Sequence, residues 1–66
     1  MKIKIWATGF DSKLLYEGCE IISPMVNDLW TVKDGPTYQV TGREYVYDEY
    51  NELVLDIYAE YVTSNI

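Results

Sequence analysis

The sequence contains no histidine and a single cysteine, Cys19, among its 66 residues. Without histidine the chain lacks the most common general base of enzymes, and without a second cysteine it can form no internal disulfide and no cysteine-based zinc site. Its four glycines are isolated at positions 9, 18, 35 and 42, so no glycine-rich phosphate loop is present. These absences predict a protein that is not an enzyme and has neither a cofactor nor a resident metal ion.

Targeting and membrane signals are also missing from the N-terminal segment MKIKIWATGF. Its apolar stretch is broken by Lys4 and Gly9, and no small-residue cleavage site follows. We therefore expect neither a signal peptide nor a membrane span. A lone thiol without a targeting segment fits a reducing compartment, which predicts a cytoplasmic protein.

The composition predicts a folded chain in spite of its net charge of −6. Hydrophobic residues make up 48% and aromatic residues 15% of the chain, whereas disordered acidic chains are poor in both. A chain this short buries only about 60% of the surface that its unfolded form exposes. We expect one small domain spanning residues 1–66, stabilised by aromatic packing or by self-association.

Alternation of apolar and polar residues predicts strands along most of the chain. The expected strands cover residues 2–8, 14–22, 29–33 and 37–41, and a hairpin follows Gly42, where the chain must end a strand or bend. Asp34, Gly35 and Pro36 form a turn, and Pro24 can begin a single helical turn. The predicted fold is all-β, with five or six short antiparallel strands in a small sheet or partly open barrel. The expected core consists of Ile3, Ile5, Leu15, Ile21, Trp30, Val32, Tyr38, Val40, Tyr45, Tyr47, Leu53, Leu55 and Ile57.

The last hairpin has two candidate registers. A two-residue loop at Tyr50 and Asn51 would bury carboxylates, at a cost of several kcal/mol each. A three-residue loop over residues 49–51, with Asn51 in the left-handed conformation, instead places Tyr45 and Tyr47 on the apolar face. The sequence therefore favours the three-residue loop.

This register places acids opposite each other on the outer face of the hairpin. Glu44 is then opposite Asp56, and Asp48 is opposite Glu52, each pair costing some tenths of a kcal/mol to about 1 kcal/mol. Through Arg43 the chain has five basic and five acidic residues, but after Arg43 it has six acids and no base. The whole net charge is therefore expected on this hairpin.

Three interpretations of the acidic face are open. It can be a solvated surface that keeps a small protein soluble, although such surfaces normally mix both signs of charge. It can hold a divalent cation, although Asp48, Glu49 and Glu52 lack the alternation and glycine of a calcium loop. It can imitate a nucleic acid, with fixed rows of negative charge for a surface that neutralises phosphates. On the third interpretation, the residues that bind the partner are Glu44, Asp48, Glu49, Glu52, Asp56, Tyr58 and Glu60.

In size, acidity and aromatic content the chain resembles small phage-encoded proteins that occupy the DNA site of a host protein. The resemblance concerns the overall character of the chain and includes no shared motif. It implies an inhibitor in the host cytoplasm whose partner is a basic, DNA-binding protein, such as a nucleoid protein or a repair enzyme. The negative face also argues against direct binding to nucleic acid or to an anionic membrane.

Two other classes of function remain open. The protein can be an adaptor or assembly module, in which outward-facing Trp6, Tyr16 and Tyr58 or an exposed strand edge form a homodimer or dock a partner. For these aromatic residues the alternative is packing within a small barrel. The protein can also inhibit a host enzyme at a site unrelated to nucleic acid.

Overall fold

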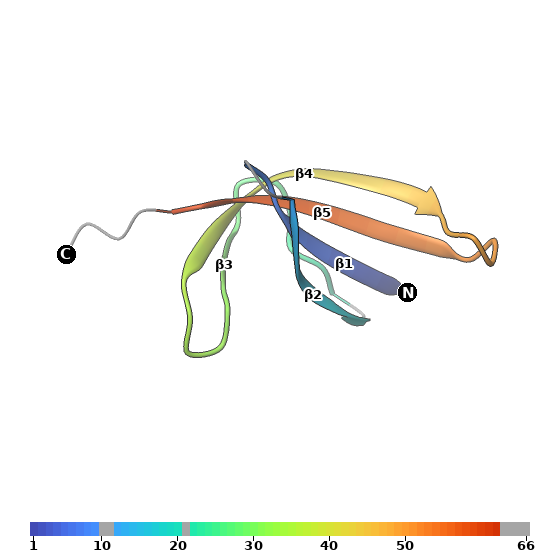
Figure 1. The fold of residues 1–66 in the computed structure, drawn as a ribbon, viewed down its shortest axis with the longest axis horizontal. Helices are drawn as coiled ribbons and strands as arrows, with labels where there is room; N and C mark the ends of the chain where they lie inside the picture. The colour runs from blue at the N-terminus through green and yellow to red at the C-terminus, as the bar shows by residue number, and fades with distance from the viewer. Residues whose placement is uncertain (10–11, 21, 63–66) are drawn as a thin grey trace.

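The computed structural model describes residues 1–9, 12–20 and 22–62, and these form one curled sheet with no helix. The strand order is β2-β1-β5-β4-β3. Figure 1 shows β4 and β5 as a long ribbon, with β2 and β3 turned toward the same side, so that the sheet is an open half-barrel. The all-β prediction is confirmed. The five strands are β1 (Lys2–Ala7), β2 (Lys13–Cys19), β3 (Leu29–Thr31), β4 (Thr37–Tyr47) and β5 (Leu53–Tyr61).

The first and last strands pair in the middle of the sheet. β1 runs antiparallel to β2 and parallel to β5, with Ile3 opposite Leu55 and Ile5 opposite Ile57. Opposed residues lie on the same face of a sheet, so the apolar residues of both strands meet on the concave side. The alternation of residues did not predict this parallel pair, because it joins segments about 50 residues apart.

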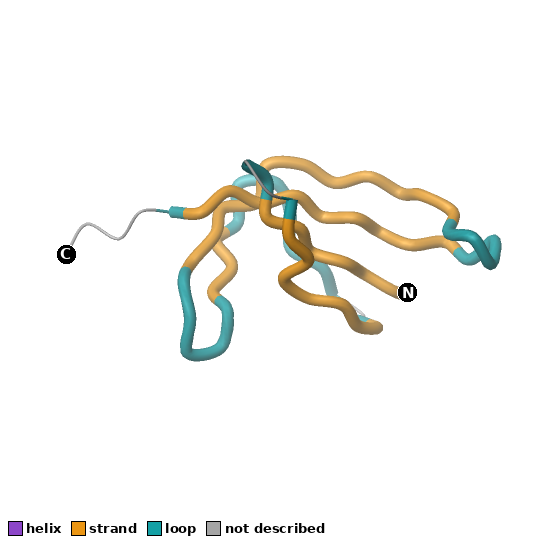
Figure 2. Tube along the Cα trace, in the orientation of Figure 1, coloured by secondary structure: helices purple, strands orange, loops and turns teal. Residues whose placement is uncertain are grey.

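The β4–β5 hairpin has the predicted three-residue loop. Tyr45 is opposite Leu55 and Glu44 is opposite Asp56, as the favoured register requires. Residues 48–52 form the hairpin tip, which projects from one end of the molecule (Figure 2). Asp48 holds this tip together, since its Oδ1 accepts the backbone N–H groups of Tyr50 at 2.8 Å and of Glu52 at 2.9 Å.

Asn51 is left-handed in this loop, with a φ of 61°. We expect Asn51→Ala to destabilise the protein by about 1 kcal/mol, because a Cβ without a local hydrogen-bonding group is disfavoured in this conformation. Asn51→Gly is the control, and it should retain or slightly raise stability. Urea denaturation followed by circular dichroism measures both changes. Equal stability of the alanine variant and the wild type would contradict the role of this position.

A turn or a bend was expected at three further places, and the structure agrees with the prediction to a different degree at each. Residues 33–36 make the expected turn, in which the Val32 N–H donates to the Pro36 carbonyl at 3.0 Å. At Gly42 the chain does not end a strand. β4 continues through a bulge between Val40 and Gly42, so two expected strands are one. The helical turn expected at Pro24 is absent from this described segment, where the Met25 N–H instead donates to Asp28 Oδ2 at 2.8 Å.

The core lies on the concave side of the sheet. Packed against it are Leu15, Tyr16, Trp30 and Tyr38, which are partly buried. Of these four, only Tyr16 was not expected. Ile21 lies outside the described residues, and Val32 is half-buried. The buried residues of this core, each at most 2% exposed, are Ile3, Ile5, Val40, Leu55, Ile57 and Ala59. Val54 is also buried, but it is opposite Lys2 and Val46 and lies outside this cluster.

The prediction of a buried Tyr45, Tyr47 and Leu53 is wrong, since they are 56%, 70% and 39% exposed. The pairing of β1 with β5 begins at Lys2 and Val54, so the hairpin extends beyond the end of β1. On the concave side, the end of the hairpin therefore lacks the side chains of the neighbouring strands that bury the centre of the sheet. The alternation of residues predicts which face of the hairpin a side chain is on, but it does not predict how far the neighbouring strands extend over that face.

Candidate functional site

The convex side of β1, β5 and β4 is one continuous surface, which we call the outer face. Opposed residues share a face, so the strand registers define its members. Its edge toward β2 adds Glu17, which is opposite Lys4. The residues of the outer face on the three central strands are Lys2, Lys4, Trp6, Gln39, Gly42, Glu44, Val46, Val54, Asp56, Tyr58 and Glu60.

The structure gathers the predicted partner-binding residues into two groups. Glu44, Asp56 and Tyr58 lie together, and the Tyr58 hydroxyl donates to Glu44 Oε1 at 3.1 Å. Partial burial, followed by the hydrogen bond to Glu44, raises the pKa of Tyr58. Glu60 follows on the same face of β5. The second group is in the hairpin tip, where Asp48, Glu49 and Glu52 are found.

The expectation of an acidic face without bases is wrong at its centre. β1 places Lys4 opposite Asp56, and the Trp6 indole N–H donates to Asp56 Oδ1 at 3.1 Å. Asp56 thus accepts a hydrogen bond from Trp6 and has a base, Lys4, as its neighbour across the strand pair. No local pattern of residues predicts this arrangement, because Trp6 and Asp56 are 50 positions apart.

Lys2 is engaged at the other end of the same strand. Its Nζ is 2.8 Å from Glu17 Oε2, and this contact raises the pKa of Lys2 and lowers that of Glu17. Asp48 and Glu52 raise the pKa of Lys2 further, by smaller amounts. The two lysines therefore stand among acids and do not neutralise the face.

Three acids of the face and the tip have free side chains. The carboxylates of Glu49, Glu52 and Glu60 are exposed and make no hydrogen bond or ion pair with the residues that the structure describes. Asp48 differs, since one of its oxygens holds the loop. These three carboxylates are exposed and accessible to a partner.

Neither a metal-binding cluster nor a membrane-spanning helix is found among the described residues. Across residues 1–9, 12–20 and 22–62, no three Asp, Glu or Cys side chains cluster closely enough to hold a metal ion. Nor does this part of the chain contain a helix long and apolar enough to cross a membrane.

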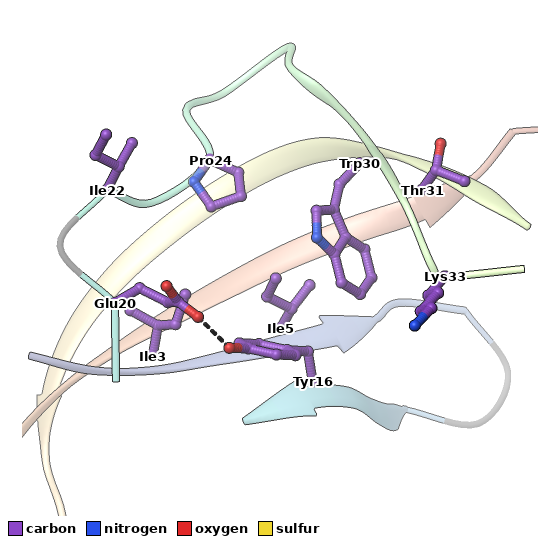
Figure 3. A pocket seen from close by; sticks show the side chains of 9 residues that line it. All are labelled: Ile3, Ile5, Tyr16, Glu20, Ile22, Pro24, Trp30, Thr31 and Lys33. Carbon is purple, nitrogen blue, oxygen red and sulfur yellow. Dashed lines mark hydrogen bonds between the residues drawn. The ribbon is translucent and has the colours of Figure 1, made fainter. Parts of the chain in front are cut away.

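A pocket of about 330 Å³ opens on the concave side of the sheet (Figure 3). Tyr16 of β2 and Trp30 of β3 line it, and their ring centroids are 6.2 Å apart in an edge-to-face contact. This contact bridges the two ends of the curled sheet. The prediction that Tyr16 faces outward is wrong, because a register shift beside Ile5 turns it toward the core. The pocket is lined by Ile3, Ile5, Tyr16, Glu20, Ile22, Pro24, Trp30, Thr31 and Lys33.

Gly18 leaves room for the Tyr16 side chain. A Cβ at Gly18 would lie 2.5 Å from the Tyr16 hydroxyl oxygen, which no ordinary contact allows. The Tyr16 hydroxyl also donates to Glu20 Oε1, and this hydrogen bond is the main cause of the raised pKa of Tyr16. The glycine and the glutamate together hold the ring in place.

We expect Glu20→Ala to lower the pKa of Tyr16 toward its ordinary value. The folded protein holds the phenolic proton more tightly than the unfolded chain does. This contribution to stability is therefore present below the ordinary pKa of tyrosine and is lost as the pH rises through the folded-state value. NMR titration of the Tyr16 ring measures the change, with Glu49→Ala as the control. An unchanged Tyr16 titration in Glu20→Ala would contradict the assignment.

Comparisons with protein-family models, with curated proteins and with solved structures found no match to this chain. Its function must therefore be inferred from its own residues. The features that bear on function are the acidic outer face, the hairpin tip and the exposed tyrosines of β4.

Proposed function

We propose that this protein is a non-catalytic inhibitor that occupies the basic, DNA-binding surface of another protein. The supporting observation is the concentration of acids on the outer face and the hairpin tip, where Lys2 and Lys4 are the only bases among the described residues. Of the ten acids that the structure describes, seven lie there: Glu17, Glu44, Asp48, Glu49, Glu52, Asp56 and Glu60.

The strand geometry sets the spacing of these charges. Alternate residues on a strand are about 7 Å apart, so Asp56 and Glu60 are separated by about 13 Å, with Glu44 on the neighbouring strand. A surface that binds DNA neutralises successive phosphates with lysines and arginines, and such a surface is complementary to fixed rows of carboxylates. Charge complementarity of this kind accelerates the encounter and selects the partner.

Two aromatic residues lie within the acidic surface. Trp6 of β1 is opposite Tyr58 of β5, and both are half-buried. They provide apolar area and hydrogen-bonding groups where DNA presents sugars and bases. Aromatic residues at the centre of an interface commonly contribute most of its binding energy, so this pair would slow dissociation.

The engagement of Asp56 changes its role in the proposal. With Lys4 opposite and the Trp6 indole donating to it, Asp56 positions the aromatic pair more than it attracts a partner. The attraction comes mainly from Glu44, Glu60 and the tip residues Glu49 and Glu52. Lys4 also reduces the repulsion between Glu44 and Asp56, so the acidic face costs less stability than the hairpin alone would imply.

Capture from a bacterial lysate tests this function. The immobilised protein should retain a basic protein both with and without nuclease treatment, and a salt gradient should release it, because screening weakens contacts between charges. Duplex DNA added at low salt should compete with the captured protein. The resemblance to phage-encoded inhibitors implies a nucleoid or repair protein as the partner. A captured protein that still binds DNA while held on the column would contradict mimicry.

A further inference from the structure

One edge of β4 is open at the hairpin end of the sheet. β5 pairs with β4 over nearly its whole length, but β3 pairs only with residues 37–39, and Asn27 and Asp28 add hydrogen bonds to Val40. Within the described residues, no strand lies beside positions 41–47 on that side. Figure 1 shows this part of β4 continuing beyond β3 toward the hairpin. An edge of this kind is a template for pairing with another strand.

The hydrogen bonds of the hairpin show which backbone groups face the open edge. The Asp48 N–H donates to the Glu52 carbonyl at 2.9 Å, so the backbone groups of Asp48 point toward β5. These directions alternate along an antiparallel strand, so Arg43, Tyr45 and Tyr47 direct their N–H and C=O groups to the open side. The side chains of Tyr45 and Tyr47 are 56% and 70% exposed beside them.

We propose that two copies of this chain pair antiparallel along this edge, with Tyr45 at the two-fold axis. Tyr45 then lies opposite Tyr45 of the second copy. Arg43 lies opposite Tyr47 of the second copy, and Tyr47 lies opposite Arg43 of the second copy. All three pairs are of the hydrogen-bonded type, giving about six new backbone hydrogen bonds. The two sheets become one continuous sheet, and the contact is the same patch on both copies.

Charge selects this register among those centred between positions 43 and 46. A centre at Arg43 opposes two arginines, and a centre at Glu44 opposes two glutamates. A centre at Val46 places Glu44 opposite Asp48. Like charges directly opposite are destabilising, and only the register centred on Tyr45 avoids them. It places Glu44 opposite Val46 and Arg43 opposite Tyr47, while the Arg43 guanidinium donates to Ser23 Oγ of its own chain at 2.9 Å.

The dependence of affinity on ionic strength distinguishes this dimer from the complex with a basic protein. Each copy carries a net charge of −6, so two copies repel each other over the rest of their surfaces. Salt screens this repulsion and leaves the backbone hydrogen bonds and the tyrosine contacts in place. The dimer should therefore tighten as salt rises, whereas the complex with a basic protein should weaken.

Sedimentation velocity under reducing conditions tests the pairing. The wild type should change from monomer to dimer as its concentration rises. Tyr45→Lys and Tyr45→Glu should each raise the dissociation constant about fivefold or more, because each loses the tyrosine contact and places like charges opposite at the axis. An equimolar mixture of the two variants should restore the dimer, since lysine then faces glutamate. Tyr50→Lys, at a tip residue that is 78% exposed, is the control and should dimerise like the wild type.

Tyr45 is exposed, so these variants should keep the fold, which circular dichroism checks. A wild type that stays monomeric at millimolar concentration would overturn the proposal. So would a dimer that persists in both single variants. A mixture that fails to restore a dimer lost in the single variants would overturn the register centred on Tyr45. These outcomes do not depend on the proposed capture of a basic protein.

Discussion

Ile57→Ala is expected to leave the protein largely unfolded at room temperature. Ile57 is fully buried and is opposite Ile5 on one side and Arg43 on the other, at the centre of the sheet. Truncating a buried isoleucine to alanine costs about 2–5 kcal/mol. A core in a chain of this size rarely supplies more than about 3–5 kcal/mol in total. The loss therefore matches most of the stability of the fold, and urea denaturation monitored by circular dichroism should show it.

Leu53→Ala is the matched control for this prediction. Leu53 is on the same strand and in the same alternating apolar row as Ile57, but it is 39% exposed. Its truncation removes less buried area and should cost no more than about 1 kcal/mol, since surface substitutions have small effects. Similar losses in the two variants would show that the end of the hairpin is covered as well as the centre, contrary to the structure.

Neutralising four glutamates should remove most of the affinity for the captured basic protein. The variant combines Glu44→Gln, Glu49→Gln, Glu52→Gln and Glu60→Gln. Each exposed ion pair contributes up to about 1 kcal/mol, or about fivefold in affinity, so four together should weaken binding by about 100-fold or more. The dependence of affinity on salt should also become shallower. Isothermal titration calorimetry at several salt concentrations measures both effects.

The fold should tolerate these four substitutions. The glutamine at position 44 keeps an oxygen that can accept the Tyr58 hydroxyl, and the repulsion between positions 44 and 56 is removed. The free energy of unfolding should therefore stay the same or rise. Asp56 is left unchanged because it accepts the Trp6 indole N–H and faces Lys4. Replacing it would alter the packing as well as the charge.

Two single substitutions distinguish the effect of charges on the outer face from the effect of the net charge of the protein. Glu60→Gln and Asp34→Asn each remove one negative charge, but Asp34 lies in the turn between β3 and β4, away from the outer face. Asparagine also tolerates the left-handed conformation of position 34, where φ is 57°. Glu60→Gln should weaken binding about threefold to fivefold, and Asp34→Asn should leave it unchanged. Equal losses would mean that overall charge, and no particular face, attracts the partner.

The local features of the fold could be predicted from the sequence. Alternation with a period of two identified the strands, and the cost of burying carboxylates chose the register of the last hairpin. The left-handed Asn51 and the turn after Val32 followed from the conformational preferences of asparagine, glycine and proline. Each of these depends on residues that are neighbours in the sequence, and such preferences act before any long-range contact forms.

The composition of the outer face and the extent of the core were decided by the tertiary structure. The pairing of β1 with β5 brings Lys4 to Asp56, leaves Tyr45 exposed beyond its end and leaves one edge of β4 open. Local residue preferences were enough to predict a β protein with an acidic hairpin. Only the structure decided which acids are engaged and which tyrosines are exposed, because contacts between segments about 50 residues apart leave no periodic signal in either segment.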